Sequence, residues 1–435
     1  PTRVLHPGRR GGRVVCVKGT APMVSAQAKE SVSLKEYQQA KASQAVSLNQ
    51  AMVMAFENSP VLALRRAAVS IQQGQLDHAS RWAPSNPEFE LGARQAPDQA
   101  DESLEYGVRV TQEIWMGNRG DLGQSRARSN LTSRQQELEY LKVATKARVR
   151  AAYFRILLAQ KELETATRAV ELMQRTKDLV EMSVKQGKQT RIDLNTAVIG
   201  LARARNQKAS AEQKLEQSKI DLTEVLGVSP SDAVGVTGEL DVTLEDLPPT
   251  SQLVEMAQSQ RADLKAAAAR IAADESGLEV AKSLTIPNLK VFGFYDREEG
   301  SNLFGAGVSM PLTVFHDYSG EQRQAAARLK TSELEAEALR LATERQVVSA
   351  VARYESTAVR LRQMNESILE RSEETLQLMQ KALRAGKVGA SDVLAAQDNL
   401  LSVRQEYVQA QNDYIDAVRA LEISTGGALS MSAGS

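Results

Sequence analysis

Two Gly-Lys pairs, Gly187-Lys188 and Gly386-Lys387, are the residues best placed to do chemistry in this 435-residue chain, and they lie 199 positions apart. Glycine readily takes the left-handed conformation that ends a helix, and a neighbouring lysine can meet the exposed carbonyl groups and the helix dipole. The pattern therefore predicts that each pair ends a helix at a tight turn. On the residues alone, the pairs are helix caps.

Catalytic and metal-binding patterns are missing from the sequence. It contains no Gly-rich phosphate loop, no His-Glu-x-x-His motif and one cysteine, Cys16. The histidines, His6, His78 and His316, lack partners at ligand spacing. Basic and acidic residues number 54 each, so no net field favours nucleic acid. We predict a chain that is not an enzyme and needs no cofactor and no resident metal.

Two long segments without glycine or proline lead into the Gly-Lys pairs. They run from Gln124 to Gln186 and from Glu321 to Ala385, and as helices each would be about 95 Å long. A compact domain cannot bury rods of this length. They need lateral neighbours on both sides, and their many alanines allow close approach.

The same pattern occurs twice along the chain, which predicts a tandem duplication. Three matched pairs share the offset of 199: Val184–Lys188 with Leu383–Lys387, Asp193-Leu194 with Asp392-Val393, and Leu226-Gly227 with Thr425-Gly426. A period of about 200 residues is too long for a solenoid repeat. We therefore expect two copies of one large motif.

Each copy is expected to contain a helix, a strand hairpin, a long helix and a return helix. In the first copy, 48–227, these elements span 48–81, 87–114, 118–186 and 190–226, and Pro60 opens a second helix within the first span. In the second copy, 251–427, they span 251–284, 288–314, 320–385 and 390–425. A linker, 228–250, joins the copies, and 428–435 is a C-terminal tail.

Both expected hairpins alternate apolar and polar residues, as strands with one dry and one wet face do. Ten of the chain's 18 aromatic residues lie within 82–115 and 287–318. Such clustering is typical of a lipid-facing barrel with aromatic girdles, and also of hairpins that pack on a soluble core. The candidate membrane-interface aromatics are Phe89, Tyr106, Trp115, Phe292, Tyr295, Phe304 and Phe315. Phe292 falls on the opposite face of its strand from Tyr295.

The number of strands sets the expected assembly. Four strands cannot close a barrel, for which eight is about the minimum, whereas three chains supply about twelve strands and as many helical rods. A homotrimer follows if the strands are membranous. A soluble coiled-coil scaffold would also explain the rods, but it gives no reason for the aromatic hairpins.

From Leu48 to Gly427 the order of elements resembles the TolC-like outer-membrane factors, the exit ducts of tripartite efflux and secretion systems. The most specific segment is Gly386–Leu394, followed by Ala396-Gln397 and Leu400. The resemblance implies a membrane α+β fold: a trimer with a twelve-stranded barrel in the lipid of a Gram-negative outer membrane and a twelve-helix barrel in the periplasm. It also implies two partners, a periplasmic adaptor and an inner-membrane RND-type pump.

Three short motifs are similar to those of the cation-efflux branch, which serves exporters of cobalt, zinc, cadmium or copper. They are Asn86-Pro87-Glu88-Phe89, Gln112-Glu113-Ile114 and Gly117-Asn118-Arg119. This similarity implies passive conduction of heavy-metal cations. Multidrug efflux or type I secretion is the alternative that the motifs leave open.

The resemblance further implies roles for the residues at the two turns. Six of them would form the periplasmic tip that docks the adaptor: Gly187, Lys188, Gly386, Lys387, Val388 and Gly389. Arg191, Asp193 and Asp392 are candidates for a gate, because a trimer makes each a ring of three and close carboxylates repel. They are alternatively solvated helix caps. Val388 stands where some members of the family carry a gating arginine.

The N-terminal region supports two interpretations. Basic residues precede Ser25-Ala26-Gln27-Ala28, which has the small-x-small form of a signal-peptidase site, but the apolar stretch is short and interrupted by Lys18. Residues 1–28 are therefore a candidate targeting segment and 29–47 a mobile segment, with Cys16 an incidental thiol rather than a lipid anchor. No window approaches 18 apolar residues, so we expect no transmembrane helix.

Overall fold

The computed structural model describes residues 46–95, 104–232, 234–238, 244–298, 301–313, 315–364 and 366–429. All described residues belong to one compact unit, Ala42–Ser435. The candidate targeting segment, 1–28, and Cys16 lie outside the described residues.

The first repeat contains two short helices, two strands and two long helices: α2 (Leu48–Asn58), α3 (Pro60–Ala79), β1 (Glu88–Gln95), β2 (Leu104–Ile114), α4 (Arg119–Lys185) and α5 (Arg191–Leu226). The Ser47 side chain accepts a hydrogen bond from the Gln50 amide, and so caps α2. Ser59 caps α3, which Pro60 opens as its sequence position predicts. A short 3-10 turn, η1 (Pro230–Asp232), follows α5.

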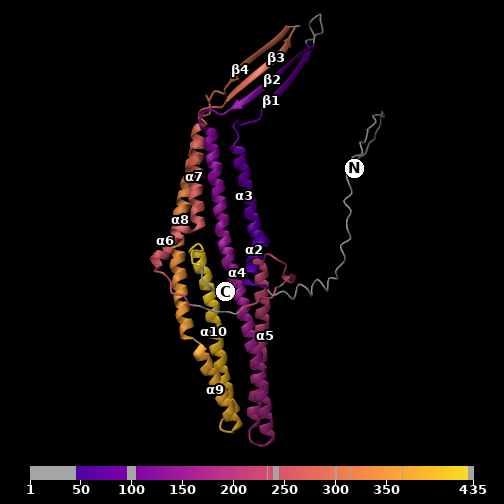
Figure 1. Ribbon diagram of the computed structural model, residues 1–435, viewed down its shortest axis with the longest axis vertical. Coiled ribbons are helices and arrows are strands. Elements are labelled where there is room, and N and C mark those ends of the chain that lie inside the picture. Colours follow the sequence, from indigo (N-terminus) through magenta and orange to yellow (C-terminus); the bar gives the residue numbers. More distant parts are fainter. Residues whose placement is uncertain are drawn as a thin grey trace, which may run out of the picture. The chain divides into compact units, whose positions relative to one another are not determined.

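The second repeat has the same order but more breaks: α6 (Thr250–Gln260), α7 (Ala262–Ser283), β3 (Leu289–Glu298), β4 (Ser301–Ser309), α8 (Ser319–Gln363), α9 (Glu366–Arg384) and α10 (Ala390–Ser424). The single helices expected over 251–284 and 320–385 are each two helices. Figure 1 shows the strands at one end of the long helices and the two Gly-Lys turns at the other.

The break between α6 and α7 is made by Arg261, whose backbone is extended and whose side chain is buried. Its guanidinium pairs with Asp263 at 2.6 Å and donates to Gln346 at 2.9 Å and to the Ser424 carbonyl at 3.2 Å. These bonds stabilise the buried guanidinium, and Arg261 could not form them from within a continuous helix. The break between α6 and α7 is therefore caused by contacts with distant parts of the chain.

The break between α8 and α9 lies at Met364, which leaves helical geometry with φ −96° and ψ 43°. The Met364 amide still donates to the Arg360 carbonyl at 3.0 Å. The helix expected over 320–385 thus ends at a residue that is neither glycine nor proline.

The four strands form one antiparallel sheet in the order β1-β2-β3-β4. One face is almost entirely apolar and is exposed on this chain, with Phe89 67% and Phe304 85% accessible. The cross-strand pairs Phe89–Val110, Val108–Tyr295 and Tyr295–Phe304 belong to it. The opposite face bears most of the charged side chains, so the predicted division into dry and wet faces is observed.

Phe292 lies on the polar face, opposite Thr111 and Gly307. A Cβ on Gly307 would come within 2.6 Å of the Phe292 ring, so the ring covers this glycine, and the Arg109 guanidinium lies 5.3 Å from the ring centre. A membrane-interface role for Phe292 stays a prediction, and the polar face suits it less than the apolar face suits Phe89 and Phe304. Its contacts are those of an aromatic ring that covers a glycine across the sheet.

The helices are held by two matching cores, one for each repeat. The first surrounds Ala151, Ile156 and Leu158 of α4, and the second surrounds Val347 and Tyr354 of α8. None of the described helices is both long enough and apolar enough to cross a membrane.

A buried ion pair joins the two repeats between α4 and α10. Arg150 of α4 pairs with Glu422 of α10, and their side chains are only 12% and 7% exposed. Burial lowers the pKa of the Arg150 guanidinium, because the charged form loses hydration. Beside this pair, Arg155 of α4 binds Asp416 of α10.

Replacing Glu422 with alanine should destabilise the protein by about 3–5 kcal/mol, because it leaves the Arg150 charge buried and unpaired. The measurement is denaturant unfolding of the purified protein. Glu216→Ala is the matched control: Glu216 pairs with Lys219 but is 65% exposed, and such pairs contribute at most about 1 kcal/mol. Equal loss in both variants would contradict a structural role for the buried pair.

Candidate functional site: the two-turn tip

The two Gly-Lys turns have the same backbone geometry. Gly187 and Gly386 have φ of +72° and +70°, the left-handed conformation predicted for them. The amide of the following lysine, Lys188 or Lys387, donates to a carbonyl five residues earlier at 2.9 or 3.0 Å. This is the Schellman arrangement, which satisfies the last carbonyl groups of a helix.

Each return helix is capped by an aspartate at its third position. Asp193 accepts a hydrogen bond from the Thr190 amide at 2.9 Å, and its own amide donates to the Thr190 hydroxyl at 3.2 Å. Asp392 accepts from the Gly389 amide at 2.9 Å. Both candidate gate aspartates thus act as helix caps, which was one of the two interpretations left open for them.

The two aspartates also converge on Gly389. A Cβ placed on Gly389 would lie 3.7 Å from an Asp193 carboxylate oxygen and 3.8 Å from one of Asp392. The turns of the two repeats therefore meet at this glycine. Arg191 is exposed at the first position of α5, and it forms no salt bridge within the described part of the chain.

An apolar cluster, here called the tip cluster, fills the space between the hairpins just above the turns. Its buried members are Val180, Ala197, Leu376, Leu383, Val393 and Leu400. Val388 is half-buried and packs against it. Of the six residues predicted to dock an adaptor, Val388 is therefore also a packing residue, whereas Lys188 and Lys387 are exposed.

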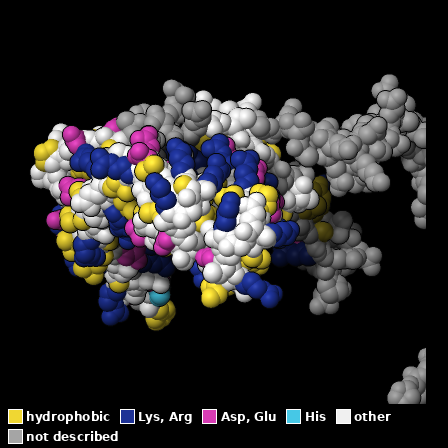
Figure 2. All heavy atoms as spheres, turned by 90° about the horizontal axis from the view of Figure 1, so that it is seen from below, with side chains coloured by type: hydrophobic (Ala, Val, Ile, Leu, Met, Phe, Trp, Pro, Cys, Tyr) yellow, Lys and Arg dark blue, Asp and Glu magenta, His cyan; other side chains and the backbone are white. Residues whose placement is uncertain are grey.

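Charges of both signs line the approach to the tip. On α4, Lys177 and Lys185 both bind Glu181, and their hydrogen bonds lower the pKa of that carboxyl. Seen from below in Figure 2, the end of the molecule shows intermixed basic and acidic side chains with apolar patches between them. A partner here would meet a mixed surface rather than one strong field.

Most of the predicted interface aromatics lie on or next to the apolar face of the sheet. Tyr106 and Tyr295 lie side by side on that face with ring centres 6.3 Å apart. Phe315 follows β4 and is fully exposed, and Trp115 follows β2 and packs close to Gly120. With Phe89 and Phe304, six of the seven predicted aromatics are placed where an interface role is compatible with their surroundings.

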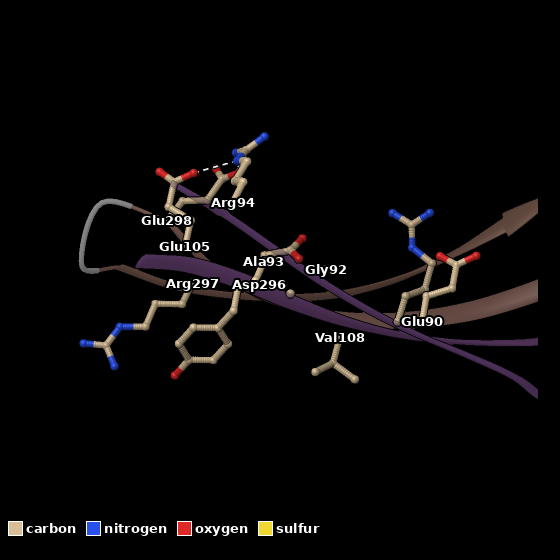
Figure 3. Close-up of a pocket in the computed structure, with 12 residues that line it drawn as sticks. Glu90, Gly92, Ala93, Arg94, Glu105, Val108, Asp296, Arg297 and Glu298 are labelled. Carbon is tan, nitrogen blue, oxygen red and sulfur yellow. Dashed lines mark hydrogen bonds and ion pairs between the residues drawn. The ribbon is translucent and has the colours of Figure 1, made fainter. Parts of the chain in front are cut away.

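Near the hairpin loops, the polar face of the sheet holds an ion-pair network (Figure 3). Arg94 lies 2.6 Å from Glu105 and also binds Glu298. In the close-up these three side chains stand on one side of the sheet, with Arg297 and Val108 on the other. The negative charge on the polar face of the sheet is therefore partly neutralised by ion pairs within one chain.

Gly200 was missed in the sequence analysis. It lies on α5, and a Cβ there would fall 2.4 Å from a methyl group of Leu394 on α10. Nearby, Arg203 of α5 pairs with Asp398 of α10 at 3.0 Å. The available signal was a lone glycine inside a long helix, which usually has a packing reason.

Comparison with known families gives two matches along the chain. The family model described as "Outer membrane efflux protein" matches residues 51–228 and 253–427. These segments coincide closely with the two predicted repeats, 48–227 and 251–427.

Among the curated proteins similar to the chain are a resistance protein and an export protein. The cobalt-zinc-cadmium resistance protein CzcC of Cupriavidus metallidurans is 24% identical over 295 residues, which is 66% of this chain and 70% of the relative. The pyoverdine export outer membrane protein OpmQ of Pseudomonas putida is 24% identical over 425 residues, 89% of this chain and 87% of the relative.

Solved outer-membrane channels share the fold. CusC aligns with a TM-score of 0.74 at 17% identity, over 87% of this chain and 92% of that one. VceC of Vibrio cholerae aligns with a TM-score of 0.73 at 18% identity, over 91% of this chain and 99% of that one.

Alanine at Gly187 or Gly386 should destabilise the protein by about 1–2 kcal/mol each, because an L side chain is strained at their positive φ. Gly123 is the matched control. It lies in α4 with open space around its Cα, so Gly123→Ala should stabilise by about 0.5–1 kcal/mol. Denaturant unfolding measures all three variants, and a stabilising Gly187→Ala would argue against the left-handed turn.

Proposed function

The chain belongs to the outer membrane efflux protein family, and we propose that the cargo of its channel is heavy-metal cations. As a member of this family it is a non-enzymatic trimeric duct of the Gram-negative outer membrane that extends into the periplasm. Each chain contributes its four strands to the shared barrel. A soluble scaffold is thereby excluded.

The observation that carries the cation proposal is the charge on the polar face of the sheet. Six acidic side chains share this face with three basic ones: Glu88, Glu90, Glu105, Glu113, Asp296 and Glu298 with Arg94, Arg109 and Lys290. The face opposite is apolar and suits lipid, so the charged face borders the lumen. Three chains would surround the lumen with an excess of negative charge, which concentrates cations.

Similarity to CzcC points the same way, whereas the cation-branch motifs have a structural explanation as well. Gln112 donates to the Ser85 carbonyl at 3.0 Å, and Arg119 donates to the Ser283 carbonyl at 2.6 Å. Asn288 connects these two motifs, because it donates to Glu113 at 2.8 Å and accepts from Arg119 at 3.2 Å. Two of the three motifs thus have structural contacts that hold the ends of the strands and of α4 in place.

Small organic molecules are the second candidate cargo. The similarity to OpmQ extends over more of the chain than the similarity to CzcC. Phe292 and Phe294 also place two aromatic rings on the polar face. Such rings would contact an apolar solute in the lumen.

Members of the family work with an adaptor and an inner-membrane pump, and we propose that the two-turn tip is where the adaptor docks. Lys188 and Lys387 are exposed there, and Gly389 leaves the junction of the two turns without a side chain. A gate formed by Arg191, Asp193 and Asp392 is part of this proposal. Because both aspartates already cap helices, any gating function would be additional to capping.

Deletion of the gene for this protein should lower the tolerance of the cells to zinc, cobalt and cadmium and raise the content of these metals in the cells. Their tolerance to dyes and antibiotics should not change. The metal content of cells with and without the protein is measured by mass spectrometry. Selective loss of tolerance to organic compounds would favour the second candidate instead.

A paired variant tests the charge argument. Glu90→Gln with Asp296→Asn should reduce the preference for cations in planar bilayers, read as a smaller reversal potential in a potassium chloride gradient. Glu216→Gln on the exposed face of α5 is the matched control and should change nothing.

Gly389→Trp should abolish export while trimers still form, because the indole would fill the junction where the two turns meet. Gly389→Ala is the matched control, since a Cβ there is 3.3 Å or more from its neighbours and φ is −84°. Export in cells and trimers in detergent are the two readouts. Normal export by the tryptophan variant would remove Gly389 from the docking site.

A further inference from the structure

A cavity lies between the two helical hairpins of one chain, α4–α5 and α9–α10, which Figure 1 shows in the lower half of the molecule. We propose that this cavity binds a small uncharged amphipathic molecule, an apolar ring system that carries one hydrogen-bond donor. The site is formed by the helices of a single chain. The proposal therefore goes beyond the conduction of cargo and does not depend on which cargo the channel carries.

The cavity has a volume of about 520 Å³ and is lined by all four helices. One end reaches Leu158, which belongs to the core of the first repeat. Next to the other end lies a smaller cavity of about 160 Å³, which extends to Leu376 and Leu400 of the tip cluster. Cavities of about 300–1,000 Å³ between helices are common sites for small molecules. The larger cavity is therefore of the size that a small organic ligand needs.

One wall of the cavity is apolar because small side chains on the first hairpin leave space there. Ala166 of α4 and Ala211 of α5 are buried and line the cavity. On the second hairpin, α9 begins after the break at Met364 and packs on α10, and Leu369 and Val408 complete the apolar wall. Apolar surface of this kind is better covered by an apolar group than by water.

A buried polar atom in the same cavity lacks the hydrogen bond that it needs. Gln207 of α5 lines the cavity, and its side-chain oxygen is buried and has no hydrogen-bond partner within the described part of the chain. Gln380 and Gln397, which line the smaller cavity, each have one such atom as well. Leaving a buried acceptor unpaired is unfavourable. A ligand that donates an N–H or O–H to Gln207 would remove this cost.

The charges around the cavity favour a ligand without net charge. Three basic and three acidic side chains line it: Lys161, Arg168 and Arg404 with Glu162, Glu370 and Glu373. Four of these six are already in ion pairs, because Glu373 binds Arg404, Glu162 binds Lys214 at 2.7 Å and Arg168 binds Glu164. A charged ligand would have to compete with these pairs. An uncharged ligand would leave them in place.

Protection of a cysteine at the edge of the cavity tests the proposal. N-phenyl-1-naphthylamine is the probe, because it is uncharged and joins an aromatic body to one N–H group. In a Cys16→Ser background, Ser210→Cys places a thiol at an exposed position that lines the cavity. The rate of its reaction with a maleimide is measured on purified trimers with and without the probe.

Ala209→Cys is the matched control, since this neighbouring residue of α5 is also exposed but does not line the cavity. We expect the probe to slow the reaction of Ser210→Cys several-fold and to leave that of Ala209→Cys unchanged. Both thiols meet the same concentration of free probe and the same detergent. A difference between them therefore reports binding in the cavity.

A second variant tests the hydrogen bond to Gln207. Gln207→Leu keeps a side chain of similar size but removes the acceptor, so half-maximal protection of Ser210→Cys should require about ten times more probe. Lys208→Gln is its matched control, because Lys208 is adjacent in α5 and does not line the cavity. It should leave the protection unchanged.

Three results of the labelling experiment would overturn the proposal. Equal slowing of both thiols would mean that the probe acts through the detergent, and no slowing of either would mean that the cavity takes up water alone. A thiol at 210 that fails to react even without the probe would mean that a neighbouring chain covers the cavity. Protection that Gln207→Leu does not weaken would overturn recognition through the hydrogen bond. None of these results bears on the cargo of the duct.

Discussion

The fold depends on lateral packing along α4. This helix has 67 residues and contacts α3, α5, α7 and α10. It therefore packs against helices of both repeats. Most of the stability of a helix in a protein comes from the packing of its apolar face against neighbouring elements. The small side chains of Ala144, Ala147, Ala151 and Ala152 are buried where those neighbours approach.

The two repeats contain equivalent hydrogen bonds, made by a buried tyrosine of each long helix. Tyr153 donates to the Val46 carbonyl at 3.0 Å, and Tyr354 donates to the Glu245 carbonyl at 2.8 Å. Each buried hydroxyl thus fastens a chain segment that runs outside the helices. At the start of the long helices the repeats diverge, since Gly117 takes a positive φ in one and Tyr318 takes it in the other.

Local signals account for what could be predicted from the sequence. The left-handed glycines, Pro60 and the alternation of the strands depend on a few adjacent residues, so their positions were predicted closely. Arg261 and Gly200 could not be predicted this way, because their roles depend on Ser424 and Leu394, which are distant in sequence. For Phe292 the alternation gave the face, opposite to that of Tyr295, but the glycine and the arginine that its ring contacts lie on neighbouring strands and could not be predicted.

The acidic side chains at the two ends of the long helices have different structural roles. Along the polar face of the sheet, Arg94 is shared between Glu105 and Glu298, so the surface stays hydrated without leaving a dense set of free ligands that would retain a cation. At the tip, Asp193 and Asp392 are bound to the backbone of their own helices. A carboxylate fixed in this way satisfies a backbone group that the start of a helix would otherwise leave unpaired. The charges at the tip are therefore first part of the turns, and a function in closing the duct would be additional to capping.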